Sequence, residues 1–309
     1  MKYKEWLNYW LENYVQPTAK QRTYIRYKEI VCQHIFPKLG EYSLPALTPF
    51  IMQCYITELL KAGNLKTGMG LSPNSVNSII TVLQNSLKLA CSLGYMSEYF
   101  GDKIKRPKTI EKKIESFSCL EQKKLESYIL NNNKDKLFGI VLCLYTGLRI
   151  GELLALEWAD FDLVKLELNI NKTCHDGKDA NSNFARITEK PKTSSSIRVI
   201  PLPKQLLPHL KRLKKNSTSQ YFISNNGNPI TIRSYQRTFD LLLKKLNISH
   251  RGFHTLRHTF ATRALECGMD IKTLSEILGH KNSTVTLSRY VHSFMEHKKD
   301  LMNKVGKLL

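Results

Sequence analysis

The first 105 residues carry large apolar side chains at steps of three and four, and this spacing limits the fold more than any other feature. Near the start, one side of a helix would be lined by Tyr3, Trp6, Leu7, Trp10, Leu11 and Tyr14. Similar spacing returns over 24–36, 50–60 and 76–90, the last after an N-capping pair, Ser72-Pro73. No stretch here alternates as a strand would. We therefore expect residues 1–105 to form an all-α domain.

A second domain is expected over 118–309. Ser118 and Glu121 have the spacing of a capping box, which predicts a helix start at that point. Further on, 166–170 alternates like a half-buried strand, and 197–202 resembles another. From Phe253 onward the pattern is helical again, with Gly268 and Gly279 as expected helix stops. The predicted fold class is mainly α with a small antiparallel β-sheet.

The charge of the chain points to a polyanionic partner. Lys and Arg number 47 against 26 Asp and Glu, a formal net charge of +21, which favours nucleic acid as the partner. Between the two expected domains, 106–117 has the composition of a basic linker, and the candidate phosphate contacts in and just before it are Lys103, Lys105, Arg106 and Lys108. The alternative is that this segment is only a soluble tether.

Other function classes find little support in the sequence. No run approaches the ~18 apolar residues of a spanning helix, and the chain start lacks the apolar run of a signal peptide, so we expect a cytoplasmic, nucleoid-associated protein with no membrane partner. The seven cysteines include no CxxC pair, which favours reduced thiols. His254 and His258 have zinc-helix spacing, but Thr255 stands where the glutamate would be needed. No metal and no cofactor are expected.

A small set of residues fits chemistry on a phosphodiester. Arg149, within Thr146–Glu152, and Arg257, within His254–His258, can offer planar forks to the non-bridging oxygens. Tyr290 is the candidate nucleophile, because attack by its phenolic oxygen on phosphorus would give a phosphotyrosyl ester. A phenol with a pKa of about 10 leaves more readily than a sugar alkoxide. The step can therefore be reversed by a DNA hydroxyl without ATP or metal.

The remaining candidates have supporting roles. Lys192 would donate a proton to the departing sugar oxygen. His280 would bond a non-bridging oxygen, while His254 would either orient the phosphate or hold the proton of the tyrosine. Glu152 is expected to be a buried partner that fixes Arg149 rather than a catalyst.

This ordered set resembles the tyrosine recombinase family, also called phage-type integrases, over nearly the whole chain. In that family an arginine in a TGLRxxE segment, a later lysine, an HxLRH segment, an LGH segment and a terminal tyrosine make up the active site. Those positions are here Arg149, Lys192, His254 with Arg257, His280 and Tyr290. Loop length varies at the lysine, so Lys190 and Lys178 stay open as alternatives.

The resemblance implies an architecture and an activity. A helical core-binding, SAM-like domain (1–105) and a catalytic domain (118–309) would clamp double-stranded DNA recombination sites. Four copies would exchange strands in steps through a 3′-phosphotyrosyl intermediate. The tail 297–309 would dock on an adjacent copy. Integration, excision, inversion and resolution are all possible outcomes, with possible accessory directionality factors.

Because the first helix begins almost at Met1, we expect no arm-binding domain, which favours a resolvase, an invertase or a small mobile-element enzyme. Two alternatives stay open: a type IB topoisomerase, which would reseal the same strand, and a non-catalytic DNA-binding regulator.

Overall fold

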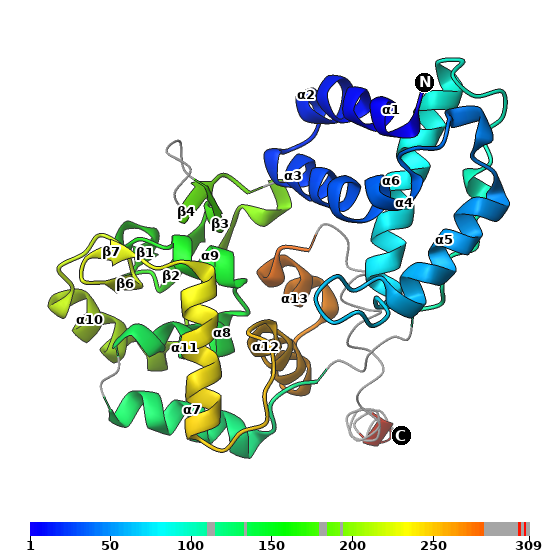
Figure 1. Cartoon of the computed structure of the whole chain (residues 1–309). Helices are drawn as coiled ribbons and strands as arrows, with labels where there is room; N and C mark the ends of the chain where they lie inside the picture. The colour runs from blue at the N-terminus through cyan, green and yellow to red at the C-terminus, as the bar shows by residue number, and fades with distance from the viewer. Residues whose placement is uncertain are drawn as a thin grey trace. The chain divides into compact units, whose positions relative to one another are not determined.

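The structure is a computed structural model, and it describes residues 1–109, 115–132, 135–178, 184–191, 194–280, 302, 303 and 306. The chain divides into two compact units, Met1–Lys112 and Lys113–Leu309 (Figure 1). Most of the described residues are helical, and the strands form small antiparallel sheets. The predicted fold class is therefore confirmed.

Unit 1 is built from helices alone among its described residues. The helices are α1 (Tyr3–Trp10), α2 (Gln16–Thr18), α3 (Gln21–Ile30), α4 (Phe36–Leu39), α5 (Pro49–Ala62) and α6 (Pro73–Ser92). At the start of α6, the Ser72 hydroxyl accepts a hydrogen bond from the N–H of Ser75 at 3.2 Å. The predicted Ser72-Pro73 cap is therefore confirmed.

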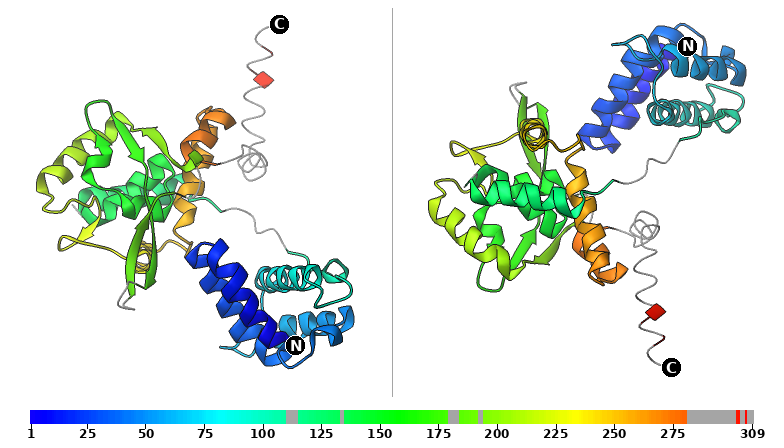
Figure 2. Two further views of the ribbon diagram at one scale, coloured as in Figure 1. Left: turned by 90° about the horizontal axis from the view of Figure 1, so that it is seen from above. Right: turned by 90° about the horizontal axis from the view of Figure 1, so that it is seen from below.

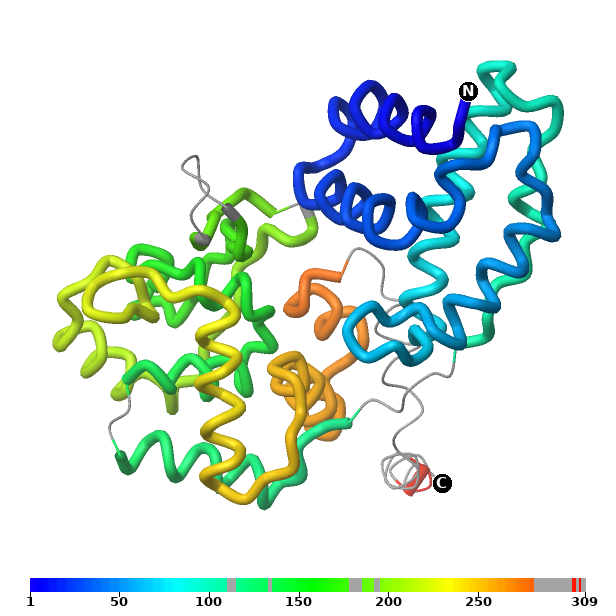
Figure 3. Tube along the Cα trace, in the orientation of Figure 1, coloured from blue at the N-terminus to red at the C-terminus, as the bar shows by residue number. Residues whose placement is uncertain are grey.

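Two of the expected helices contain a wider turn. A π-helical turn, Leu11–Val15, joins α1 to α2, and another, Val31–Ile35, joins α3 to α4. Each is followed two residues later by a proline, Pro17 or Pro37. Proline lacks an N–H and its ring collides with the preceding helical turn, so a widened turn lets the helix continue. Figure 3 traces these unbroken paths.

The core of unit 1 joins α1 to α6. Tyr3 and Trp6 are both fully buried. The Tyr3 hydroxyl lies 2.8 Å from the Ser86 hydroxyl on α6, and the Trp6 Nε1–H donates to the Ser86 carbonyl at 3.2 Å. These bonds satisfy the polar atoms of two large side chains that are otherwise buried among apolar groups.

Unit 2 combines helices with three small antiparallel sheets. Its helices are α7 (Cys119–Asn131), α8 (Phe138–Thr146), α9 (Ile150–Ala155), α10 (Leu207–Asn216), α11 (Ile232–Lys245), α12 (His254–Glu266) and α13 (Ile271–Leu278). Its strands are β1 (Phe161–Asp162), β2 (Glu167–Ile170), β3 (Thr173–Lys178), β4 (Phe184–Glu189), β5 (Arg198–Pro201), β6 (Ser224–Asn225) and β7 (Asn228–Pro229).

The three-stranded sheet has the order β1-β2-β5, with Leu168 opposite Ile200. Its strands β2 and β5 confirm the two strands expected over 166–170 and 197–202. The hairpins β3–β4 and β6–β7 were not expected. In β3, the Asp176 carboxylate accepts from the N–H groups of Ile232 and Arg233 at 2.8 and 2.9 Å, which caps the start of α11.

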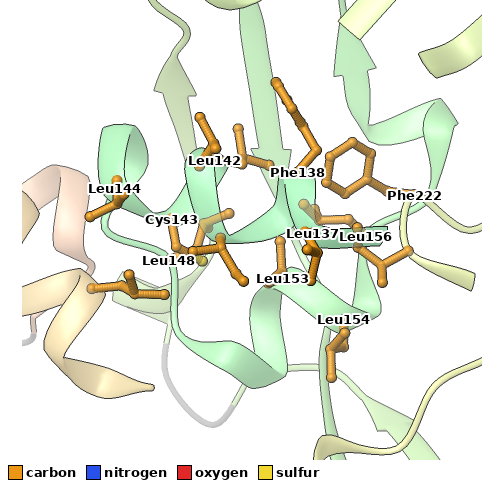
Figure 4. Packing of buried hydrophobic residues seen from close by; sticks show 14 of the residues in the cluster. Leu137, Phe138, Leu142, Cys143, Leu144, Leu148, Leu153, Leu154, Leu156 and Phe222 are labelled. Carbon is orange, nitrogen blue, oxygen red and sulfur yellow. The ribbon is translucent and has the colours of Figure 1, made fainter. Parts of the chain in front are cut away.

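The core of unit 2 surrounds α8. Figure 4 shows Leu142 and Cys143 of α8 together with Leu148, Leu153 and Phe222, which belong to the same buried cluster. Helix α12 packs against α8, and α13 packs against α12. Figure 2 shows α12 and α13 side by side in two further views. This packing brings the ends of α8 and α13 next to a buried face of α12.

The start of unit 2 is fixed to α12. The Phe117 N–H donates to the Thr259 hydroxyl at 2.9 Å, and the Arg263 guanidinium donates to the Phe117 carbonyl at 2.9 Å. Directly afterwards, Ser118 and Glu121 exchange hydrogen bonds of 3.2 and 2.8 Å, so the predicted capping box is confirmed.

All seven cysteines have free thiols. Within the described part of the chain, no helix has both the length and the apolar character needed to cross a bilayer.

Candidate active site

A tight turn between α8 and α9 positions Arg149. Gly147 ends α8 with φ +65, and a Cβ there would lie 2.5 Å from Phe260 and 2.6 Å from Leu278. Glycine alone fits this left-handed, crowded position. Arg149 follows as the N-cap of α9, and its backbone N–H donates to Glu152 at 3.0 Å. The turn therefore fixes both the backbone and the direction of Arg149.

Glu152 is a buried carboxylate shared by two arginines. Its Oε1 accepts from Arg149 Nη1 at 2.7 Å, and its two oxygens accept from Arg198 Nη1 and Nη2 at 3.2 and 3.0 Å. Burial alone would raise the pKa of this carboxyl. The hydrogen bond and charge of Arg198, together with Arg149, outweigh burial and hold the pKa below its usual value.

Arg257 is almost wholly buried, with 1% of its surface exposed. Its Nη1 donates to the Gly147 carbonyl at 2.8 Å and its Nη2 to the Leu278 carbonyl at 2.7 Å. These carbonyls belong to the C-terminal ends of α8 and α13, where helix dipoles favour a cation. Nη2 also lies 2.8 Å from Nε2 of His280.

Three arginines bind successive carbonyls at the end of α13. Arg198 Nε donates to Ile277 at 2.5 Å, Arg257 to Leu278, and Arg149 Nη2 to Gly279 at 3.3 Å. The last carbonyls of a helix lack partners within the helix, so these bonds fix the terminal turn.

Gly279 then ends α13 with φ +64, and Gly268 has φ +88 directly after the Cys267 cap of α12. Both predicted helix stops are confirmed.

His254 begins α12, one helical turn before Arg257. Its ring meets the ring of His258 edge-on, with centroids 4.6 Å apart. The role predicted for His254 remains a prediction.

The described residues therefore bring four of the predicted site residues into one network: Arg149, Glu152, Arg257 and His280. Lys192 and Tyr290 lie outside the described residues. Of the alternative lysines, Lys190 is exposed, directly after β4. In this part of the chain, no cluster of three or more His, Cys, Asp or Glu side chains could hold a metal ion.

Arg198 also belongs to this network, and its motif predicts no role for it. It opens β5 opposite Ile170, and in a strand it shares a face with Ile200, which is buried. An arginine on the inward face of an alternating strand was the signal that could have identified it.

Two of the four predicted phosphate contacts near the linker have side-chain partners within unit 1. Arg106 donates to the Asn77 carbonyl, Thr81 and Gln84 at 3.1, 3.2 and 2.6 Å, which attaches this segment to α6. Lys103 pairs with Glu98 at 2.8 Å on an exposed surface. Lys105 and Lys108 are exposed.

The model of the phage integrase family matches residues 119–297, and the model of the phage integrase N-terminal SAM-like domain matches residues 2–60. The chain is 30% identical over 327 residues to "Tyrosine recombinase XerC-like" of Caldanaerobacter subterraneus subsp. tengcongensis, covering 97% of this chain and 81% of the relative.

Two solved structures share the fold. The Tn1549 transposon integrase in complex with a circular intermediate DNA superposes with a TM-score of 0.81 at 21% identity, covering 99% of each chain. A lambda integrase tetramer bound to a Holliday junction gives a TM-score of 0.67 at 19% identity, covering 92% of this chain and 79% of the other.

The fold and these matches define an enzyme of site-specific DNA recombination. The chain belongs to the phage integrase family, and the resemblance to tyrosine recombinases seen in its motifs is confirmed.

Proposed function

We propose that this recombinase cleaves DNA by attack of Tyr290 on a phosphodiester bound at Arg149, Arg257 and His280. One observation carries the proposal: guanidinium groups from α9 and α12 meet at the end of α13, directly before His280. Arg149 is the accessible one, with 36% of its side chain exposed. A preorganised arginine at that position would stabilise the charge that builds on phosphorus oxygens during displacement.

The proposed reaction balances without a metal or ATP. The phenolic oxygen of Tyr290 forms a bond to phosphorus, and the bond from phosphorus to the 5′-oxygen of the next nucleotide breaks. Lys192 supplies the proton that the 5′-oxygen takes, with Lys190 or Lys178 as alternative donors. His254 either orients the phosphate or receives the proton of Tyr290. Attack by a 5′-hydroxyl of another strand on the phosphotyrosyl ester completes the exchange.

The assignment of the domains is also part of the proposal. Residues 1–105 would be the core-binding domain, 106–117 a basic linker with Lys103, Lys105, Arg106 and Lys108 near DNA phosphates, and 118–309 the catalytic domain. The match of residues 2–60 to the SAM-like domain model supports the first of these.

Four copies would act on paired sites, as the lambda integrase tetramer on a Holliday junction suggests. The likeness to a transposon integrase supports a mobile-element role. Accessory directionality factors remain a prediction.

The experiment uses Tyr290→Phe. The substrate is a nicked suicide duplex with the sequence that the wild-type chain selects from a randomised library. Cleavage beside the nick releases a short fragment that dissociates, and a covalent adduct therefore accumulates. The wild-type chain should form this adduct, and Tyr290→Phe should form none. Tyr42→Phe, at an exposed tyrosine in unit 1, is the matched control and should behave as wild type.

An undiminished adduct in Tyr290→Phe would refute the proposed nucleophile. On an intact supercoiled plasmid, relaxation by resealing of the same strand, with no exchange between duplexes, would indicate topoisomerase-like action. Binding without any adduct would indicate a non-catalytic regulator.

A further inference from the structure

Arg198 connects parts of the site that are distant in the sequence. Only 7% of its side chain is exposed. Its two Nη atoms bond both oxygens of Glu152, its Nε donates to the Ile277 carbonyl, and Nη1 also donates to the Ser196 carbonyl at 3.1 Å. One guanidinium therefore links the start of α9, the end of α13 and the turn before β5.

This arrangement affects the charge available on Arg149. Glu152 binds Arg149 through its backbone N–H and through Nη1. A buried carboxylate interacts strongly with nearby cations, because the surroundings screen it poorly. Because Arg198 shares this carboxylate, part of the Arg149 charge is left for another anion. Loss of Arg198 would leave Glu152 to neutralise Arg149 more completely.

Stability alone is a weak reason for such a residue. Replacing a buried ion pair with apolar side chains is often neutral or stabilising, and Arg198 stands opposite the buried Ile170 in the sheet. An apolar side chain would suit that strand position. The bonds to Glu152 and to the Ile277 carbonyl instead let Arg198 fix the positions of the Glu152 carboxylate and the end of α13, both of which contact Arg149.

We propose that Arg198 is a positioning residue for strand cleavage. It holds Glu152 and the end of α13 in place, so that the Arg149 guanidinium stays directed at the phosphodiester and Glu152 neutralises less of its charge. The inference rests on the proposed function, in which Arg149 binds that phosphodiester. Arg198 itself does not touch DNA in this scheme.

The test compares Arg198→Met, Arg198→Lys and a control, Arg212→Met, whose arginine pairs with Asp135 on another part of unit 2. Single-turnover cleavage of the selected suicide duplex is measured at saturating protein, together with the duplex Kd and thermal unfolding. Arg198→Met should slow cleavage about 10²-fold, the effect expected of a misplaced catalytic group, with little change in Kd. Arg198→Lys should be slower than wild type yet faster than Arg198→Met, because it keeps the charge without the fork. The control should cleave at the wild-type rate.

A substrate with an uncharged linkage distinguishes an effect of the Arg198 substitution on the charge of Arg149 from an effect on folding. With a methylphosphonate at the cleaved position, the charge that Arg149 must balance is reduced, so the slowing in Arg198→Met should largely disappear. Equal slowing on both linkages would overturn the inference. A wild-type cleavage rate for Arg198→Lys would also overturn the inference. If Arg198→Met fails to fold, the rate of Arg198→Lys provides the test. If the wild-type chain forms no adduct, or Tyr290→Phe keeps it, the proposed function itself fails; normal cleavage by Arg198→Met defeats this inference alone.

Discussion

At the scale of single residues, Glu152 is a buried negative charge that depends on its arginine partners. It is 3% exposed, and its negative charge would be costly there without cations. Arg149 and Arg198 supply them, which makes the ionised form more stable in the folded chain than in the unfolded one. The same carboxylate fixes the backbone at the start of α9.

The stability of the chain should therefore depend on Glu152 at acid pH. Because the folded pKa of Glu152 lies below its unfolded value, its contribution is present above about pH 4.3 and is lost as the pH falls through the folded pKa. In Glu152→Gln the free energy of unfolding should be about 3–5 kcal/mol lower at pH 7, as for other broken buried pairs. It should also fall less steeply below pH ~4.3.

Denaturant titrations between pH 7 and pH 3 measure both effects. Glu266→Gln, at a partly exposed pair with Arg263, is the control and should cost less than about 1 kcal/mol. Parallel pH profiles for wild type and Glu152→Gln would contradict this account of Glu152.

At the scale of elements, the end of α13 organises the site. Gly279 has φ +64, and a Cβ there would lie 2.9 Å from Arg198 Nη1 and 3.1 Å from the Ser195 carbonyl. Gly268 also has a positive φ, +88, but a Cβ there would meet nothing within 4 Å. The two glycines therefore separate backbone strain from crowding.

Gly279→Ala and Gly268→Ala should both lose about 1–2 kcal/mol from the left-handed backbone. Gly279→Ala should lose more and should also slow single-turnover cleavage, because the added carbon displaces Arg198 or the turn at Ser195. Thermal unfolding and suicide-duplex cleavage measure these effects. Equal behaviour of the two variants would show that the crowding around Gly279 is unimportant.

Helices and the central strands were predictable because their apolar residues repeat with the period of the element. The β3–β4 hairpin was not, because Thr173–Lys178 has no apolar alternation; cross-strand pairing and the Asp176 cap on α11 stabilise it instead. Arg149, Arg257 and His280 could be found from their motifs. The network joining them depends on carbonyls at Gly147 and at 277–279, which carry no side-chain signal.

At the scale of the whole molecule, charge is the dominant property. The formal net charge is +21, and the chain belongs to a family that acts on DNA. The predicted clamp would place many of these cations near phosphates. Binding should then release counterions from the duplex.

The affinity for the selected duplex should fall steeply with salt. If about six phosphates are neutralised, Kd should rise about 10³-fold between 50 and 200 mM salt. Fluorescence anisotropy over this range gives the slope. A slope shallower than about −2 in log K against log salt would be incompatible with a clamp of this kind.

Mass spectrometry of the trapped adduct tests most directly whether the phenolic oxygen of Tyr290 becomes bonded to DNA phosphorus. After nuclease and trypsin digestion, the peptide that begins at Tyr290, after Arg289, should carry a nucleotide joined through its 3′-phosphate to the phenolic oxygen of the tyrosine. A nucleotide attached to any other residue would contradict the account.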